Sequence, residues 1–149
     1  MNAKDYLQQA RDLDCLVRFT LLELKGLRET ASGLTAAAGA AGADRAGEPL
    51  ARARERIGEL EGRLEDEVSR LVTLREQVET VINRLPDPRE RTVLRCRYLL
   101  GMGWEEMGDE LYCSASTLHR WHSAALKHLV PPREACPALP RRGSADNLS

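Results

Sequence analysis

The most regular hydrophobic pattern in the chain runs from residue 50 to residue 85. An apolar residue recurs at every seventh position, and a second apolar series follows it by three positions. The first series is Leu50, Ile57, Leu64, Leu71, Val78 and Leu85, and the second is Ala53, Leu60, Leu74 and Val81. Only Glu67 interrupts the second series. Five consecutive heptads with charged flanks predict a long coiled-coil helix.

A second long helix is predicted upstream, over residues 3–31, because apolar and small residues recur there at helical spacing without a proline. This stripe consists of Ala3, Leu7, Ala10, Leu13, Leu16, Val17, Leu21, Leu24, Leu27 and Ala31. Residues 32–49 are rich in glycine and alanine and end in Pro49, which predicts a flexible loop.

Two helices joined by such a loop can bury both stripes by folding back on one another. Residues 1–85 are therefore expected to form an antiparallel helical hairpin, or coiled coil, with the loop at about 32–49. The second helix is longer than the first, so its excess could pair with another chain. Homodimerisation through the coiled coil is left open, and Glu67 would then set register or partner choice, or else point outward.

Residues 86–130 predict three shorter helices. The sequence Leu85-Pro86-Asp87-Pro88 ends the long helix and suits a new N-cap with a proline in the first turn. Helices follow over residues 89–100 and 104–111, and a third begins with Ser114 or Ser116 as N-cap. A short helix, a turn of about three residues and a second helix form a helix-turn-helix. Gly108 inside the middle helix predicts a close helix crossing. Residues 131–149, rich in proline and small polar residues, are expected to be a disordered tail.

The last of these helices suits contact with double-stranded DNA. The start of a recognition helix fits a major groove about 12 Å wide, where its outward side chains reach base edges. Arg120 suits a guanine or a phosphate, His119 a base acceptor or a phosphate, and the serines phosphates. Arginines of the first short helix, Arg91, Arg95 and Arg97, are expected to face solvent or the phosphate backbone. The candidate DNA-binding residues are Ser114, Ala115, Ser116, His119, Arg120, Ser123 and Arg95.

Composition excludes several classes of protein. Charged residues make up 30% and aromatic residues 4% of the 149, which favours helices over a thick sheet-based core. The net charge of −1 implies no general attraction to nucleic acid or to an anionic membrane. No segment has the apolar length of a membrane span or a signal peptide, so we expect a soluble cytoplasmic protein. No glycine-rich phosphate loop and no nucleophile–base spacing occurs, so neither an enzyme nor a cofactor is expected.

The four cysteines, Cys15, Cys96, Cys113 and Cys136, are widely and unevenly spaced. This spacing supports neither a disulfide framework nor a zinc site of the usual kind. Cys113 could in principle approach His119 and His122, but a buried thiol and two helix-surface imidazoles explain the same residues. No metal is therefore expected.

The stretch from residue 85 to residue 129 resembles region 4 of bacterial sigma-70-type factors, without a gap. The matching residues are Leu85, Pro86, Glu90, Arg91, Val93, Leu94, Arg97, Tyr98, Gly101, Trp104, Glu105, Glu106, Met107, Leu111, Ser114, Thr117, Leu118, Ala125, Leu126 and Leu129. The whole chain is also similar to a family of small phage and prophage proteins that begin MNAKxYL and contain LPDP before the same motif. These resemblances imply a phage-encoded transcriptional regulator that binds DNA, with or without RNA polymerase as a partner.

Three residues depart from the sigma pattern. Tyr112 replaces the usual turn glycine, and Ala115 and His119 replace basic residues of the recognition helix. Residues 86–130 contain six Arg and Lys against six Asp and Glu, so this unit should bind DNA weakly by itself. Two other functions are therefore retained: a protein-interaction module that docks on RNA polymerase or a sigma factor, and a small terminase-like packaging protein.

Overall fold

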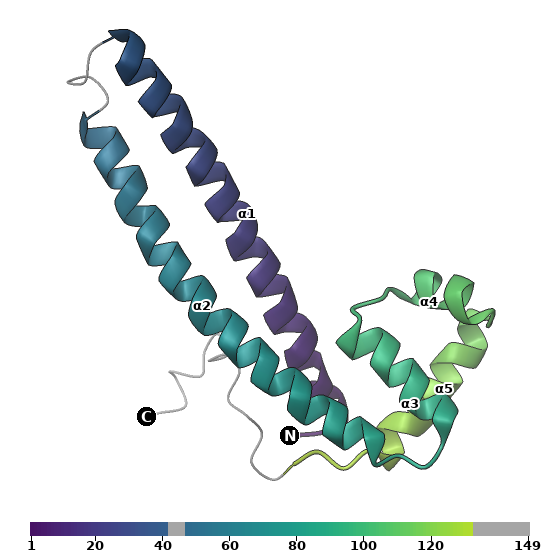
Figure 1. Ribbon diagram of the computed structural model, residues 1–149. Helices are drawn as coiled ribbons and strands as arrows, with labels where there is room; N and C mark the ends of the chain where they lie inside the picture. The colour runs from purple at the N-terminus through teal and green to yellow at the C-terminus, as the bar shows by residue number, and fades with distance from the viewer. Residues whose placement is uncertain (42–46, 133–149) are drawn as a thin grey trace. The chain divides into compact units, whose positions relative to one another are not determined.

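The computed structural model describes residues 1–41 and 47–132, and every regular element among them is a helix (Figure 1). The elements in chain order are α1 (Ala3–Ala41), α2 (Gly47–Asn83), α3 (Pro88–Leu94), the π-helix η2 (Arg95–Leu99), α4 (Trp104–Leu111) and α5 (Ala115–His128). The predicted all-α class is confirmed, as is a long α1/α2 hairpin followed by a helix-turn-helix unit.

The chain divides into two compact units by its internal contacts. One unit is Cys15–Ser69, and the other joins Met1–Asp14 to the described part of Arg70–Ser149. Both boundaries fall inside the long helices, so the second unit contains the base of the hairpin as well as the short helices. The domain limits expected from the sequence, at 85/86 and 130/131, divide the chain into consecutive segments and not by internal contacts. These limits stay a prediction. Of the expected tail, only Pro131 and Pro132 lie within the described residues.

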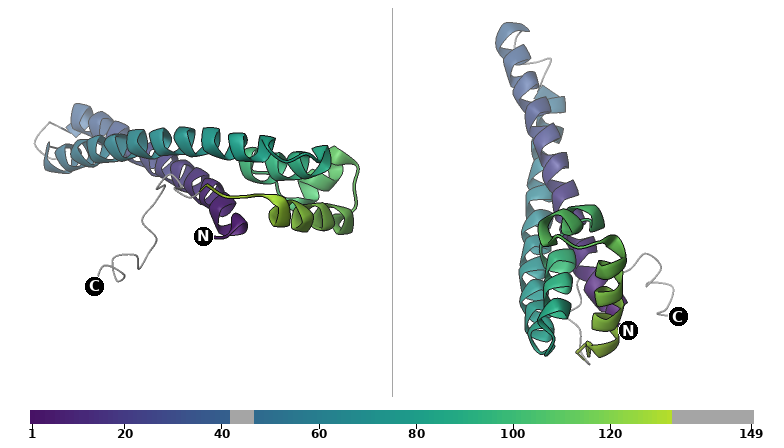
Figure 2. Two further views of the ribbon diagram at one scale, coloured as in Figure 1. Left: turned by 90° about the horizontal axis from the view of Figure 1, so that it is seen from below. Right: turned by 90° about the vertical axis from the view of Figure 1, so that its right-hand side faces the viewer.

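Within Cys15–Ser69, α1 and α2 run alongside each other in opposite directions (Figures 1 and 2). Leu24 of α1 and Leu60 of α2 are fully buried, and Val17 and Ala53 are nearly so. These residues belong to the two predicted stripes, but Leu21, which was placed in the stripe of α1, is 48% exposed, so the buried face of α1 is narrower than predicted. Burying a leucine side chain in this way contributes roughly 1.5–3 kcal/mol.

Glu67, the one charged residue in the heptad seam, points into the hairpin. Its side chain is only 4% exposed, and the Thr20 hydroxyl lies 2.8 Å from Oε1 and 3.2 Å from Oε2. Of the two roles considered for Glu67, the outward orientation is therefore wrong. A buried carboxylate needs a hydrogen-bond donor, and the Thr20 hydroxyl of α1 supplies one.

The expected loop over residues 32–49 is mostly helix. α1 continues through Ala41 and α2 begins at Gly47, so only residues 42–46, which the structure does not describe, separate them. Alanine is the best helix former, and the Thr35 hydroxyl donates to Ala31 O at 2.9 Å within the helix. Pro49 is the third residue of α2, where its missing N–H removes no intrahelical hydrogen bond.

The other unit has a core assembled from all its helices. Fully buried side chains come from the start of α1, the end of α2, α3, α4 and α5, namely Tyr6, Leu7, Leu13, Leu74, Val78, Ile82, Val93, Leu94, Met107 and Leu118, and η2 adds the almost fully buried Tyr98. Polar contacts also join the start of α1 to this unit: the Tyr6 hydroxyl donates to Gln77 Oε1 at 2.9 Å, and Arg11 Nη1 donates to Arg97 O at 2.9 Å. The first turns of the chain therefore help to support the short helices.

Candidate nucleic-acid interface

α5 begins where the sequence placed its N-cap. Ser114 has an extended backbone, and its Oγ accepts from Thr117 N at 3.2 Å. This contact satisfies one of the free amide groups of the first turn, and Ser114 is therefore the cap rather than Ser116. A Ser114 hydroxyl bond to Thr117 Oγ1 at 2.9 Å further fixes the first turn. The start of the candidate recognition helix is thus locally ordered.

The turn between α4 and α5 consists of residues 112–114. Tyr112 caps α4 with a left-handed backbone, at φ 53°, and its side chain is 94% exposed. Cys113 N donates to Gly108 O at 3.2 Å, which closes the turn onto α4. A Cβ atom on Gly108 would lie 3.1 Å from Cys113 O. Gly108 therefore allows a close approach, but the atom that comes nearest belongs to the backbone of this turn and not to a crossing helix, which the sequence had predicted.

α5 has one buried face and one exposed face. Leu118, His122 and Ala125 are buried, whereas Trp121 is half-buried, so the interpretation of His122 as a helix-surface imidazole is wrong. Opposite them lies a continuous exposed stripe, here called the α5 stripe. Its members are Ser114, Ala115, Ser116, His119, Arg120 and Ser123, all exposed. The structure therefore brings together six of the seven candidate DNA-binding residues.

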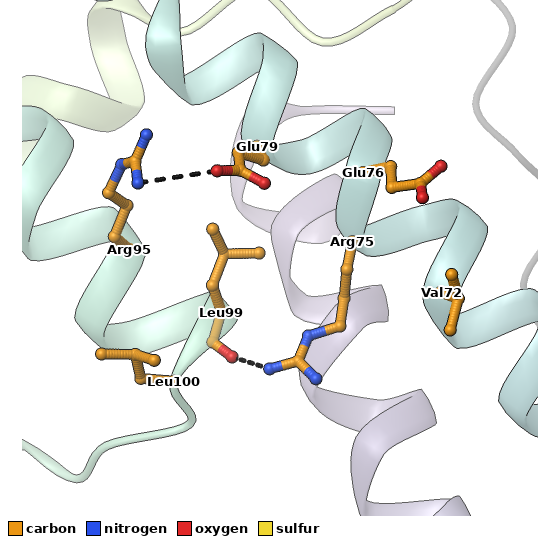
Figure 3. Close-up of a pocket in the computed structure, with 7 residues that line it drawn as sticks. All are labelled: Val72, Arg75, Glu76, Glu79, Arg95, Leu99 and Leu100. Carbon is orange, nitrogen blue, oxygen red and sulfur yellow. Dashed lines mark hydrogen bonds and ion pairs between the residues drawn. The ribbon is translucent and has the colours of Figure 1, made fainter.

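Arg95, the seventh candidate, lies against α2 instead. Its guanidinium is 3.7 Å from Glu79 Oε1 and also donates to Asn83 Oδ1 (Figure 3). Arg95, Glu79 and the neighbouring Leu99 line a recess of about 440 Å³ between α2 and η2. Arg95 thus comes from a different helix and is already engaged there by an acidic residue.

The two neighbouring arginines are also engaged inside the unit. Arg91 Nη1 donates to Leu85 O at 2.5 Å and to Pro86 O at 3.0 Å, which ties α3 to the end of α2. Arg97 donates to Met102 O at 3.2 Å and lies over the Trp104 ring at 4.7 Å. Both side chains are half-buried, and both are already engaged by backbone carbonyls of the loops that flank α3 and η2.

Trp104, the first residue of α4, is the residue that sequence reasoning missed. Its ring centroid is 4.2 Å from that of His119 and 4.9 Å from that of His122. One aromatic side chain therefore contacts two of the three histidines of α5 and the Arg97 guanidinium. His119 on the α5 stripe is held against this ring, although it stays exposed. An aromatic residue at the start of α4 was the only sequence signal for this contact.

His122 is neutral under ordinary conditions. Burial lowers its pKa to about 4, and the positive charges of Arg97, His119 and Lys4 act in the same direction. Its Nε2 lies 2.7 Å from the hydroxyl of Tyr98, and burial raises the pKa of that phenol. A neutral imidazole accepting from a protonated phenol explains this buried pair. Neither group is a sign of catalysis, since both are enclosed.

The charges around the α5 stripe are mixed. Arg120 is its one full positive charge, whereas Glu105, Glu106, Asp109 and Glu110 of α4 are all exposed. Arg89, which was not among the candidates, lies 5.9 Å above the Trp121 ring and borders a recess of about 220 Å³ beside the α4–α5 turn. This places one further cation near α5.

Among the described residues, no three His, Cys, Asp or Glu side chains are grouped so that they could hold a metal ion. Nor does any helix of residues 1–41 and 47–132 have the length and apolar character needed to cross a membrane.

α4, the three-residue turn and α5 together define a helix-turn-helix, a class of unit associated with DNA binding. A comparison with known families agrees, because residues 75–129 match the model for sigma-70, region 4. The match begins inside α2 and continues through the whole of α5. No curated protein and no solved structure matches the chain.

Proposed function

We propose that this protein is a phage-type transcriptional regulator whose α5 enters the major groove of double-stranded DNA. The observation on which the proposal depends is the α5 stripe, an uncovered helix face within a sigma-70 region 4 helix-turn-helix. Arg120 would contact a guanine or a phosphate, and Ser114 and Ser116 would bind phosphates from the start of the helix.

The charge distribution limits how strongly such a unit binds. Each neutralised phosphate adds to affinity, and Arg120 is the only cation of the α5 stripe. The four exposed acids of α4 would have to lie away from the DNA backbone. The regulator would therefore gain useful affinity through a second copy or through a protein partner such as RNA polymerase.

Selection of genomic DNA fragments by the purified chain, at two salt concentrations, tests this proposal. The wild-type protein should enrich a defined sequence, and Arg120→Ala should weaken binding to it by about 10-fold or more, since a good base contact is worth roughly 1–3 kcal/mol. Arg63→Ala is the matched control, because Arg63 is an exposed arginine of α2 within the other unit. An equal loss in both variants, or no enrichment at all, would contradict base reading by α5.

One observation favours a second function. Glu105, Glu106, Asp109 and Glu110 give α4 a wholly acidic exposed face, which suits a basic surface on RNA polymerase or a sigma factor. A module that only docks in this way would retain polymerase in a pull-down without enriching DNA. Reversal of two charges, Glu105→Lys with Glu106→Lys, should then abolish the pull-down, whereas Arg120→Ala should leave it unchanged.

A further inference from the structure

α1 has a second apolar line that none of the described residues covers. Cys15, Phe19, Leu22 and Gly26 follow one another at intervals of four, three and four residues, here called the outer stripe. Phe19 is 59% exposed and Leu22 is 67% exposed, and Cys15 and Gly26 are exposed as well. The whole outer stripe lies within the unit Cys15–Ser69.

The outer stripe lies on the face of α1 that is turned away from α2. Each of its positions comes two residues after a residue of the inner seam, so that Phe19 follows Val17, and Leu22 follows Thr20. Two residues correspond to about 200° of rotation around an α-helix. α1 therefore carries two seams on opposite faces, one filled by α2 and one open.

We propose that the outer stripe is the interface of a homodimer in which two copies of α1 pack in parallel. Single exposed apolar residues need no explanation, but several at coiled-coil spacing along three helical turns indicate a partner helix. Phe19 and Leu22 would each meet their own counterpart across a two-fold axis. At Gly26 an added Cβ would meet nothing within 4 Å, so the second helix can approach closely there.

The charges beside the outer stripe identify the partner and its direction. Arg18 and Lys25 border it on one side and Glu23 on the other. In a parallel coiled coil, a residue on the side of Arg18 faces the residue five positions later in the second helix, which lies on the side of Glu23. Arg18 would then face Glu23 of the second copy, twice by symmetry, whereas an antiparallel pair would oppose Arg18 to Lys25.

Contacts inside the single chain are compatible with this pairing. Glu23 lies 3.9 Å from Arg56, and its side chain keeps 31% of its surface exposed, so the carboxylate can accept from both arginines. Arg18 also has a contact within its own chain, which the interchain pair would share or replace. A dimer would carry two copies of α5. Two copies can contact DNA at two places, which compensates for the weak attraction of a single α5 to phosphates.

The mass of the full chain in solution tests the interface. Under reducing conditions, light scattering at increasing concentration should approach twice the chain mass of 16.6 kDa. Phe19→Lys should return the mass to that of one chain, because it places like charges across the two-fold axis. Val68→Lys, a charge introduced at an exposed valine of α2, should leave the dimer intact. A wild-type monomer, a larger ring, or equal dissociation in both variants would overturn the proposal.

Cys15 reports the direction of the two helices. In the parallel arrangement it faces its own counterpart at a distance that a disulfide can bridge, whereas the antiparallel arrangement places it opposite Gly26. Mild oxidation should therefore produce a covalent dimer in the wild type and in Cys136→Ser, but not in Cys15→Ser. A non-covalent dimer that gives no Cys15 cross-link would overturn the parallel arrangement. Retained helical circular dichroism in each variant shows that folding is unaffected.

Discussion

The hydroxyl of Tyr98 and Nε2 of His122 lie 2.7 Å apart, and both side chains are buried. Tyr98 comes from η2 and His122 from α5, so this contact joins the π-helix to the candidate recognition helix. Trp104 of α4 completes the group with its ring edge-on to His122 at 4.9 Å. η2, α4 and α5 therefore meet at one buried imidazole.

We predict that the free energy of unfolding falls when the pH drops below about 6.5. The pKa of His122 is about 4 in the folded protein and 6.5 in the unfolded chain, so between these values the unfolded state binds more protons. The stabilisation is fully present above pH 6.5 and is lost as the pH falls toward 4. At pH 5 the protonation of His122 in the unfolded chain should lower the free energy of unfolding by about 2 kcal/mol relative to neutral pH. Denaturant unfolding at several pH values would measure this loss.

The control for this prediction is His122→Gln, which keeps a hydrogen-bonding group toward Tyr98 but does not titrate. Other acidic and histidine side chains change protonation in both proteins, so the difference between the two curves isolates His122. If the plots of unfolding free energy against pH stay parallel for the two proteins from pH 7 to pH 4.5, the imidazole is not held neutral by the fold.

Replacing Tyr112 by glycine should stabilise the protein by about 1 kcal/mol. Tyr112 has φ 53°, a conformation that costs L-residues roughly 1–2 kcal/mol and that glycine adopts freely. Its exposed ring loses little on removal. Tyr112→Ala is the matched variant, since it removes the ring and keeps the Cβ that causes the strain. Thermal unfolding should rank glycine above both alanine and tyrosine, and an alanine variant as stable as glycine would contradict the explanation.

Two glycines inside helices should respond in opposite ways to alanine. Gly58 of α2 has open space where a Cβ would lie, so Gly58→Ala should raise the free energy of unfolding by roughly 0.5–1 kcal/mol. At Gly108 the same Cβ would lie 3.1 Å from Cys113 O, a backbone atom in the α4–α5 turn. Gly108→Ala should therefore lose that gain or reverse it, and equal gains at both sites in chemical denaturation would refute the close packing.

Substitutions of Thr20 and Glu67 should have non-additive effects on the free energy of unfolding. Thr20→Val leaves the buried carboxylate without its described donor and should destabilise the hairpin by about 1–3 kcal/mol. The double variant Thr20→Val with Glu67→Leu restores an apolar seam and should be at least as stable as the wild type. A double-mutant cycle by denaturant unfolding measures this coupling. Simple addition of the single effects would mean that the two side chains do not interact.

Local sequence signals predicted which segments are helical and where the short helices begin. α4 occupies residues 104–111 as expected, and Ser114 caps α5, because capping and periodicity depend on residues within a few positions of each other. The loop prediction was wrong because the alanines around the glycines favour helix strongly enough to continue α1 through Ala41. Gly33 is accommodated within α1, and Pro49 lies in the first turn of α2.

The sequence by itself determined the two long stripes, the three short helices and the outward face of α5, since each follows from helical spacing. Only the tertiary structure decided where long polar side chains go. Arg91, Arg95 and Arg97 share the composition of a phosphate-binding surface, yet Arg95 is engaged by Glu79 of α2, and the other two by backbone carbonyls of nearby loops. Glu67 faces inward because Thr20 happens to lie across the seam. Folding brings Glu79 to Arg95 and Thr20 to Glu67 from other helices, and a loop carbonyl becomes an available acceptor only once the loop's backbone conformation is fixed, so helical spacing encodes none of these contacts.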